Sequence, residues 1–260
     1  MPVEPPIVAK KASLEEPGAI AERFTSVESL KAVVTLQLTY LNDERTKENT
    51  LLDVDGAIVA RRPDSIRVQA QMPVVRTKAF DMVAHDGSFQ VYLTFKDRFF
   101  EGSTSVETRS EKRSENIRPQ HILEALLVSP LGSQGLLALD VIKEGRAPYY
   151  VIQEFVDEDG RYRINRKLWF SRATLTISRL EIRDKEGEIA TTAYYSGWQD
   201  HGDDLFPKMV VIDRPVDGYT LTVNFEKPGI NEPPTENAFL LEPPEGLEVE
   251  HIDEVAEAVT

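Results

Sequence analysis

Cysteine is missing from this chain of 260 residues. Without a thiol the protein cannot form a disulfide bond, use a thiolate nucleophile or hold a metal ion through cysteine. Long apolar runs are missing as well, since none approaches the roughly 18 residues that a membrane-spanning helix needs. The first residues lack the apolar segment of a signal peptide. These gaps exclude disulfide scaffolds and thiol enzymes.

Positive charge is also scarce. The chain has 30 Lys and Arg against 44 Asp and Glu, a formal net charge of -14 at pH 7. Because nucleic-acid-binding proteins hold the phosphate backbone with clustered Lys and Arg, this balance argues against a nucleic-acid partner. It also disfavours flat docking on anionic lipid. The most basic stretch, Arg161–Arg172, alternates its charges with apolar residues, which predicts the solvent-facing row of a strand.

Recognisable catalytic motifs are missing too. Gly132-Ser133-Gln134-Gly135 lacks the spacing of the Gly-x-Ser-x-Gly nucleophile elbow, and no strand pattern precedes it. The chain contains neither a Walker phosphate loop nor a dinucleotide-binding glycine fingerprint. We therefore expect no enzymatic activity, no catalytic residues and no cofactor.

The four histidines do not form a metal-binding pattern. His201 precedes the acidic stretch Gly202–Asp204 but has no second histidine or cysteine nearby, so a solvated acidic turn is the favoured interpretation. His85, His121 and His251 are scattered, and no spacing pairs them as ligands. The sequence predicts no metal site.

Alternation of apolar and polar residues is the strongest pattern present, most clearly from Pro63 to Gly102. Because side chains alternate faces along a strand, each alternating run predicts one apolar and one solvent-facing surface. Asp86-Gly87 lies between two such runs and favours a hairpin, because a type I′ turn needs positive φ at both central residues. The apolar rows are Ile66-Val68-Ala70-Met72, Phe80-Met82-Ala84 and Phe89-Val91-Leu93.

Similar patterns on either side bring the total to roughly eleven strands. Three further hairpins have glycine at the turn, in Asp159-Gly160, Glu186-Gly187 and Asp217-Gly218. So many antiparallel strands favour a sheet that curls on itself, and we expect a mainly β, incomplete (half-open) antiparallel β-barrel. The other predicted strands cover 30–41, 53–61, 149–156, 162–170, 175–183, 189–198, 209–213 and 219–225.

Helices are expected to cover the apolar interior of this barrel. Pro119 suits the first turn of a helix, and the apolar residues of 122–127 follow at helical spacing. A short helix is expected between Ser13 and Phe24. Residues 129–146 fit either a short helix or a buried loop. The stretch Ser103–Leu131, with prolines at 119 and 130 as hinges, is the candidate lid.

Several motifs resemble those of the LolA/LolB-like periplasmic lipoprotein carriers and their lipoprotein-sorting relatives. Each motif is short, but their order along residues 12–250 matches that family. The motifs are Arg62-Pro63-Asp64, Val83–Phe89 around Asp86-Gly87, Lys167–Phe170, Leu180–Gly187, Tyr194–Trp198 with Phe206-Pro207, and Asn237–Leu247. The resemblance implies an incomplete antiparallel barrel, lidded by helices, whose apolar interior takes up acyl chains.

The resemblance also implies a location and partners. We expect a flexible tether at 1–11, a single lipid-binding domain at 12–250 and a frayed acidic tail at 251–260, in the periplasm and tethered by a lipid upstream. The expected partners are acyl chains of a lipid or lipoprotein and a membrane-bound delivery or acceptor protein, and no nucleic acid. The alternative is an envelope sensor or scaffold of the same fold that binds a protein.

The candidate interior residues remain open to two interpretations. They either line a cavity that takes up acyl chains or form an ordinary packed core between sheet and helix. They are Leu36, Leu38, Ile66, Val68, Phe80, Met82, Phe89, Val91, Leu93, Ile122, Leu126, Leu168 and Phe170.

Overall fold

The computed structural model describes residues 19, 21–22, 24–41, 48–71, 78–105, 116–132, 135–202 and 204–252. The predicted tether at 1–11, the start of the first helix, Met72 and residues 106–115 of the candidate lid lie outside these ranges. None of the described helices has the length and apolar character needed to cross a bilayer.

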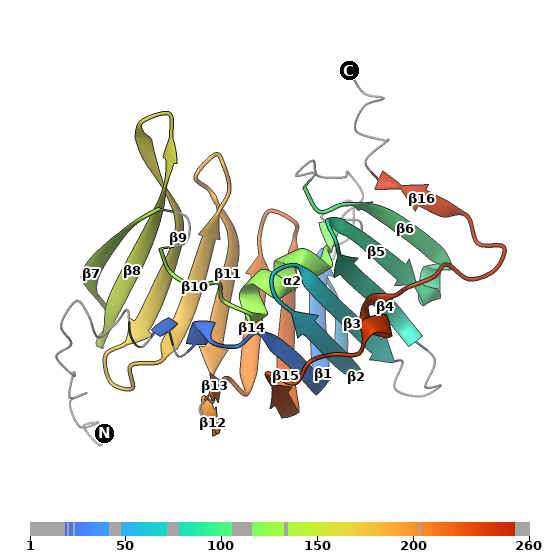
Figure 1. The fold of residues 1–260 in the computed structure, drawn as a ribbon, viewed down its shortest axis with the longest axis horizontal. Helices are drawn as coiled ribbons and strands as arrows, with labels where there is room; N and C mark the ends of the chain where they lie inside the picture. Colours follow the sequence, from blue (N-terminus) through green and yellow to red (C-terminus); the bar gives the residue numbers. More distant parts are fainter. Residues whose placement is uncertain are drawn as a thin grey trace.

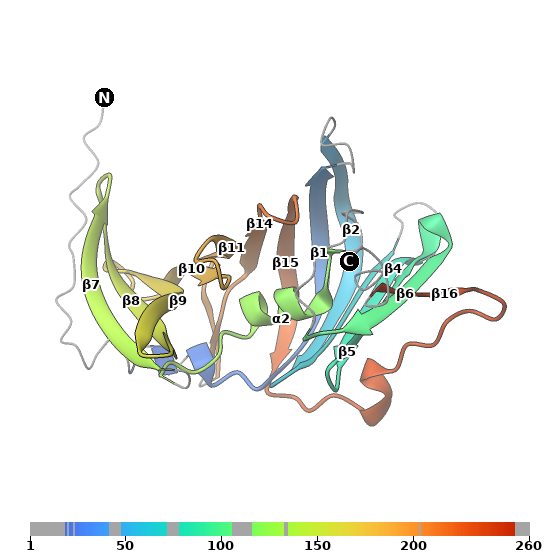
Figure 2. The same ribbon diagram turned by 90° about the horizontal axis from the view of Figure 1, so that it is seen from above.

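One curved sheet of fourteen strands makes up most of the molecule (Figure 1). Seen from above, the sheet bends around a short helix and does not close into a barrel (Figure 2). Its strand order is β16-β6-β5-β4-β3-β2-β1-β15-β14-β11-β10-β9-β8-β7. The strands are β1 Ser29–Leu41, β2 Glu48–Arg61, β3 Ser65–Gln71, β4 Lys78–His85, β5 Ser88–Leu93, β6 Arg98–Ser103, β7 Leu136–Glu144, β8 Ala147–Glu158, β9 Arg161–Ser171, β10 Ile177–Arg183, β11 Ile189–Ser196, β14 Met209–Arg214, β15 Tyr219–Ile230 and β16 Val249–His251.

The predicted hairpins are present because their turn residues accept positive φ. Asp86 and Gly87 have φ of +48° and +75° and join β4 to β5, with His85 opposite Ser88. Asp159 and Gly160, at +55° and +81°, join β8 to β9 in the same way. The turns at Gly187 and Gly218 connect β10 to β11 and β14 to β15. The half-open antiparallel sheet expected from the sequence is therefore confirmed.

The count of roughly eleven strands was too low. The described part of residues 129–146 contains neither a helix nor a buried loop, because Leu136–Glu144 forms β7 and pairs with β8 across the tight turn Gly145-Arg146. Strand β6 follows the short 3-10 helix η1, Thr94–Lys96, and was also missed. Two further short strands, β12 Gln199–His201 and β13 Asp204–Phe206, form a separate hairpin at the predicted acidic turn.

The concave face of the sheet carries the main core. The helix α2, Pro119–Leu126, lies inside the curve (Figure 2), and its Ile122, Leu123 and Leu126 are buried against the strands. Helical residues between Ala19 and Thr25 add the buried Ala21 and Phe24 to the same cluster. The predicted helix at Pro119 is thus confirmed, and so are the predicted apolar rows as far as Met72, which lies outside the described residues.

The outer face of β3–β6 is covered by the end of the chain. The 3-10 helix η3, Glu236–Phe239, places Phe239 with Val83, Phe99 and Leu241 in a second, smaller cluster. Arg67 holds this segment by donating hydrogen bonds to the carbonyls of Ala238 and Leu240 at 3.2 and 2.9 Å. Arg67 also binds both carboxylate oxygens of the buried Asp81.

After this cover the chain reaches the edge of the sheet. Strand β16 pairs with β6 in parallel, an exception to the antiparallel arrangement of the other pairs in this sheet. His251 ends β16 and Ile252 packs into the main core, so order continues two residues into the stretch expected to fray. Residues 253–260 lie outside the described ranges.

Candidate functional site: the concave interior

The predicted interior residues come together on the concave face. All thirteen belong to or pack against one continuous apolar cluster, which runs across the sheet from β6 to β8 and includes α2. Twelve are buried, and Leu38, toward the far end of β1, is half-buried. The two-residue periodicity of the apolar side chains therefore located the interior correctly.

The helix α2 lies across the floor of this interior with an apolar face and a few polar contacts. Pro119 occupies its first turn, where a missing N–H costs nothing. Arg118, immediately before the helix, lies over the ring of Phe89 at 5.2 Å. At the other end, the buried hydroxyl of Tyr195 donates a 2.7 Å hydrogen bond to the carbonyl of Ala125.

Two arginines hold the segment that follows α2. Arg62 donates to the carbonyl of Val128 and, at 2.8 Å, to that of Val27, and so links the segment to the start of β1. Arg166 donates to the carbonyls of Ser129 and Pro130 at 3.0 and 2.7 Å. Pro130, a predicted hinge, is thus held in place by a side chain of the sheet.

Arg166 is balanced by a buried carboxylate on the neighbouring strand. Glu154 is fully buried, forms an ion pair with Arg166 and accepts a hydrogen bond from the Gly132 amide at 2.8 Å. The prediction that the charges of Arg161–Arg172 face solvent is therefore wrong for Arg166. It lies in the inward row with Leu168 and Phe170 because one carboxylate partner and two carbonyl acceptors offset its desolvation.

A second polar cluster lies on the concave side of β11, β14 and β15, facing α2. Arg214 forms a buried ion pair with Asp217 at 2.6 Å and donates to Thr191 at 2.6 Å. The Tyr219 hydroxyl is buried and has no hydrogen-bond partner among the described residues. Burial raises the pKa of Tyr219 well above its ordinary value. A cluster of this kind offers hydrogen bonds within an otherwise apolar interior.

Glu124 of α2 belongs to the same region. Glu124 is exposed at the surface of the helix, yet the protein atoms crowded around its carboxyl group desolvate it and raise its pKa above that of ordinary glutamate. Arg214 and Arg166 act in the opposite direction but more weakly. A hollow of about 270 Å³ lies at the rim between β1 and the β14–β15 hairpin, lined by Tyr40 and Tyr219 of the inward rows and by Thr39, Asp213 and Thr220, which lie on the opposite face of the sheet. The interior thus combines an apolar floor with a polar corner near its rim.

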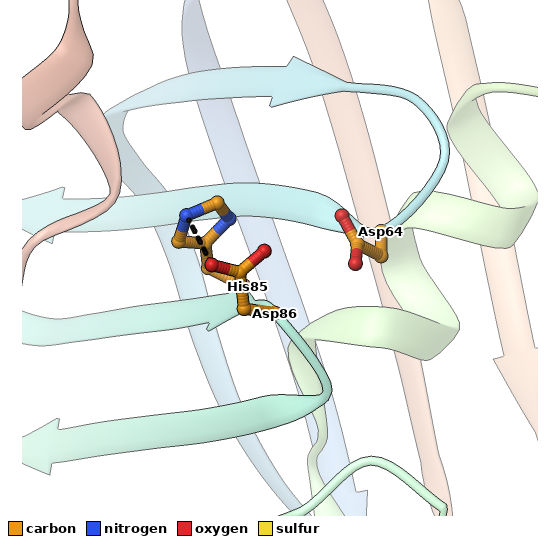
Figure 3. A group of neighbouring side chains, drawn as sticks. All are labelled: Asp64, His85 and Asp86. Atoms are coloured by element: carbon orange, nitrogen blue, oxygen red, sulfur yellow. Dashed lines mark ion pairs between the residues drawn. The ribbon is translucent and has the colours of Figure 1, made fainter.

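A further cluster, of His85 with Asp64 and Asp86, lies on the outer side of the sheet (Figure 3). One nitrogen of His85 and one oxygen each of Asp64 and Asp86 lie within 4.8 Å of one another. The Ser65 hydroxyl already bonds His85 Nδ1 at 2.9 Å and Asp64 at 3.1 Å, and Asp86 pairs with His85 Nε2 at 3.3 Å. Because these groups satisfy one another and both carboxylates are exposed, we assign no metal site here.

Comparison with known proteins was informative only at the level of structure. No protein-family profile and no curated protein sequence matches the chain. A LolA superfamily protein from Nitrosomonas europaea aligns over 89% of this chain and 99% of that chain, with a TM-score of 0.52 and 10% sequence identity. The fold is LolA-like. A DUF1329 family protein from Desulfovibrio piger aligns over 88% of this chain and 98% of that chain, with a TM-score of 0.54 and 11% identity.

The LolA-like fold agrees with the resemblance seen in the sequence motifs. The polar residues that position α2 were not singled out from the sequence, although a signal was present. Arg166 shares the even-numbered row of Leu168 and Phe170, and Tyr195 shares the inward row of Ala193. A polar residue at an inward position of a strand indicates a buried partner, and here that partner is α2 or its C-terminal segment.

Proposed function

We propose that this protein binds acyl chains of a lipid or lipoprotein in its concave interior, in the bacterial cell envelope and without covalent chemistry. The observation that carries the proposal is the continuous apolar cluster along the concave face of a LolA-like half-barrel, with the short helix α2 lying across it. A periplasmic location, an N-terminal lipid tether and a membrane-bound partner for delivery or acceptance form part of the same proposal.

The energies favour an exchange in which the acyl chain replaces α2. Removing α2 from the floor would expose three large apolar side chains, Ile122, Leu123 and Leu126, at roughly 1.5–3 kcal/mol each. A chain of about sixteen carbons offers roughly 12 kcal/mol when fully buried, at about 0.8 kcal/mol per methylene. An acyl chain can therefore displace the helix. The few polar contacts of α2 would guide its return when the ligand leaves.

The polar part of such a ligand would lie against the polar corner formed by Arg214, Tyr219 and Glu124, while the acyl chain lies on the apolar floor. The unpartnered Tyr219 hydroxyl offers a hydrogen bond to that head group.

One specific observation favours the alternative of a protein-binding scaffold. Twelve of the thirteen candidate interior residues are buried against the protein's own side chains, as they would be in a core that needs no ligand. A scaffold would keep this core closed and present other surfaces to its partner.

Native mass spectrometry of the purified protein, followed by solvent extraction, separates the two functions. A mass excess that matches phospholipid or fatty acid supports the carrier. A mass of 29.3 kDa that persists after incubation with phospholipid vesicles contradicts the carrier and supports the scaffold.

Matched substitutions on β1 locate the site. Leu38→Glu puts a charge on the inward row at a half-buried position, where the fold tolerates it, and should abolish lipid uptake. Gln37→Glu, the adjacent outward position, should leave uptake unchanged, with circular dichroism confirming that both variants fold. Equal uptake by both variants would rule out the concave face as the binding surface.

A further inference from the structure

The two edges of the sheet differ. At one edge, β16 pairs with β6, and Glu250 of β16 accepts a 2.6 Å hydrogen bond from Arg98. At the other edge, β7 pairs with β8, and no strand among the described residues pairs with its outer side. An uncovered edge presents unpaired N–H and C=O groups, which another strand can bind. The surface of interest is therefore the outer side of β7.

The side chains of β7 are unlike those of a typical edge strand, whose free edge faces water. Leu136, Leu137 and Val141 are exposed to 56%, 48% and 55%. They lie on both faces, since Leu137 and Val141 share the face of Ile152, whereas Leu136 lies on the opposite face. An edge strand with exposed apolar side chains on both faces is prone to pair with another strand.

One hydrogen bond identifies the backbone groups that point outward. The Val141 amide donates to the carboxylate of its neighbour Asp140 at 2.7 Å, so this amide points away from β8. Because backbone groups alternate in direction along an antiparallel strand, Leu137 and Leu139 offer their N–H and C=O to a new partner, and Val141 offers its C=O. The Val141 N–H would exchange its bond to Asp140 for one to the new strand.

We propose that β7 pairs with β7 of a second copy of this chain, antiparallel about a two-fold axis at Leu139. In this register Leu139 faces the second copy's Leu139, Leu137 faces Val141, and Leu136 faces Ile142. The central carboxylate, Asp140, faces Ala138. A shift by one position on each strand would set the two Asp140 side chains directly opposite each other, which disfavours that register. The sequence of β7 is thus complementary to itself.

The charge distribution is compatible with two copies meeting at this end. Residues 136–183, which span β7 to β10, contain nine Lys and Arg and seven Asp and Glu. The excess negative charge of the chain therefore lies outside this part of the sequence, and exposed charges beyond a Debye length of about 8 Å are largely screened at physiological salt. Two strands bury little area, so we expect a dissociation constant on the order of micromolar.

Sedimentation over a range of concentrations tests the association directly. The wild-type chain should shift from 29.3 kDa to twice that mass as its concentration rises. Val141→Lys should weaken the association at least tenfold, whereas Leu240→Lys, at an equally exposed apolar position away from this edge, should not. A wild-type chain that stays monomeric, or a dimer unaffected by Val141→Lys, overturns the proposal. Neither result bears on lipid uptake.

The register is tested with single cysteines, which report cleanly because the chain has none. Leu139→Cys lies on the axis, where opposed Cα atoms are about 5.5 Å apart and a disulfide can form. The two copies of Lys143→Cys would lie roughly 27 Å apart at about 3.4 Å per residue. Oxidation should cross-link Leu139→Cys alone. Cross-linking of Lys143→Cys without Leu139→Cys overturns the antiparallel pairing.

Discussion

At the scale of single residues, the interior is organised by a few charged side chains in an apolar setting. Breaking the Arg166–Glu154 pair by Arg166→Leu would leave a fully buried carboxylate without its partner, at a cost of about 3–5 kcal/mol. The double variant Arg166→Leu with Glu154→Leu should recover most of that loss. Urea unfolding measures both changes.

The control for this pair lies on the same strand. Arg163 pairs with the half-exposed Glu158, so Arg163→Leu should change the unfolding midpoint far less than Arg166→Leu. If the double variant is as unstable as Arg166→Leu alone, the lost contacts to Ser129 and Pro130 matter more than the unpaired charge.

The raised pKa of Glu124 predicts a pH-dependent stability. The folded protein holds this proton more tightly than the unfolded chain does, so the contribution is present at low pH. It is lost as the pH rises from the ordinary glutamate value of 4.5 through the raised pKa. Glu124→Gln should therefore gain stability relative to wild type over that interval. Urea midpoints across acidic and neutral pH measure it, and a pH-independent difference would contradict it.

At the scale of elements, α2 is expected to be less firmly held than the sheet beneath it. Tyr195→Phe removes the hydrogen bond to Ala125 and should cost about 1 kcal/mol. Hydrogen exchange measured by mass spectrometry should then accelerate in 119–128 and stay unchanged in β1 and β15. Tyr194→Phe, the adjacent exposed position, is the control and should leave α2 unaffected. Faster exchange throughout the sheet would mean that α2 and the sheet unfold as one unit.

The elements also mark how far the sequence could be interpreted. Strands with one apolar row, such as β3, β4 and β5, were predictable because their spacing reflects a single buried face. Strand β7 was not, because apolar residues on both faces fit a buried helix, a loop or a strand equally well. Strand β16 has only three residues, and its pairing with β6 depends on tertiary structure that no local pattern encodes.

The candidate site could be predicted in its apolar part and not in its polar part. The alternation of apolar and polar residues placed Phe89, Val91 and Leu168 on the inward face without knowledge of the fold. The contact between Tyr195 and Ala125 joins residues 70 positions apart. Such a contact follows only from the path of α2 across the sheet, which the sequence pattern left open.

At the scale of the whole molecule, the end of the chain protects one sheet edge. Truncation after Glu248 removes β16 together with the buried Ile252 and exposes the outer side of β6. This variant should aggregate on heating at a lower temperature than the full chain, as measured by light scattering. Truncation after Ile252 is the control and should behave like the full chain. Equal aggregation by both variants would show that β16 is not a protective strand.

The pairing of β1 with β15 near the middle of the sheet has a consequence for how the molecule folds. Leu30 faces Ile230, two hundred positions further along the chain, whereas most other neighbours in the sheet are joined by short hairpins. Each half of the sheet can therefore form early from local contacts, but the pairing of β1 with β15 requires a loop closure across nearly the whole chain. During synthesis, β1 emerges long before its partner. We expect the β1–β15 pairing to limit the folding rate. Until β15 has been made, the unpaired edge of β1 must be protected from pairing with other chains.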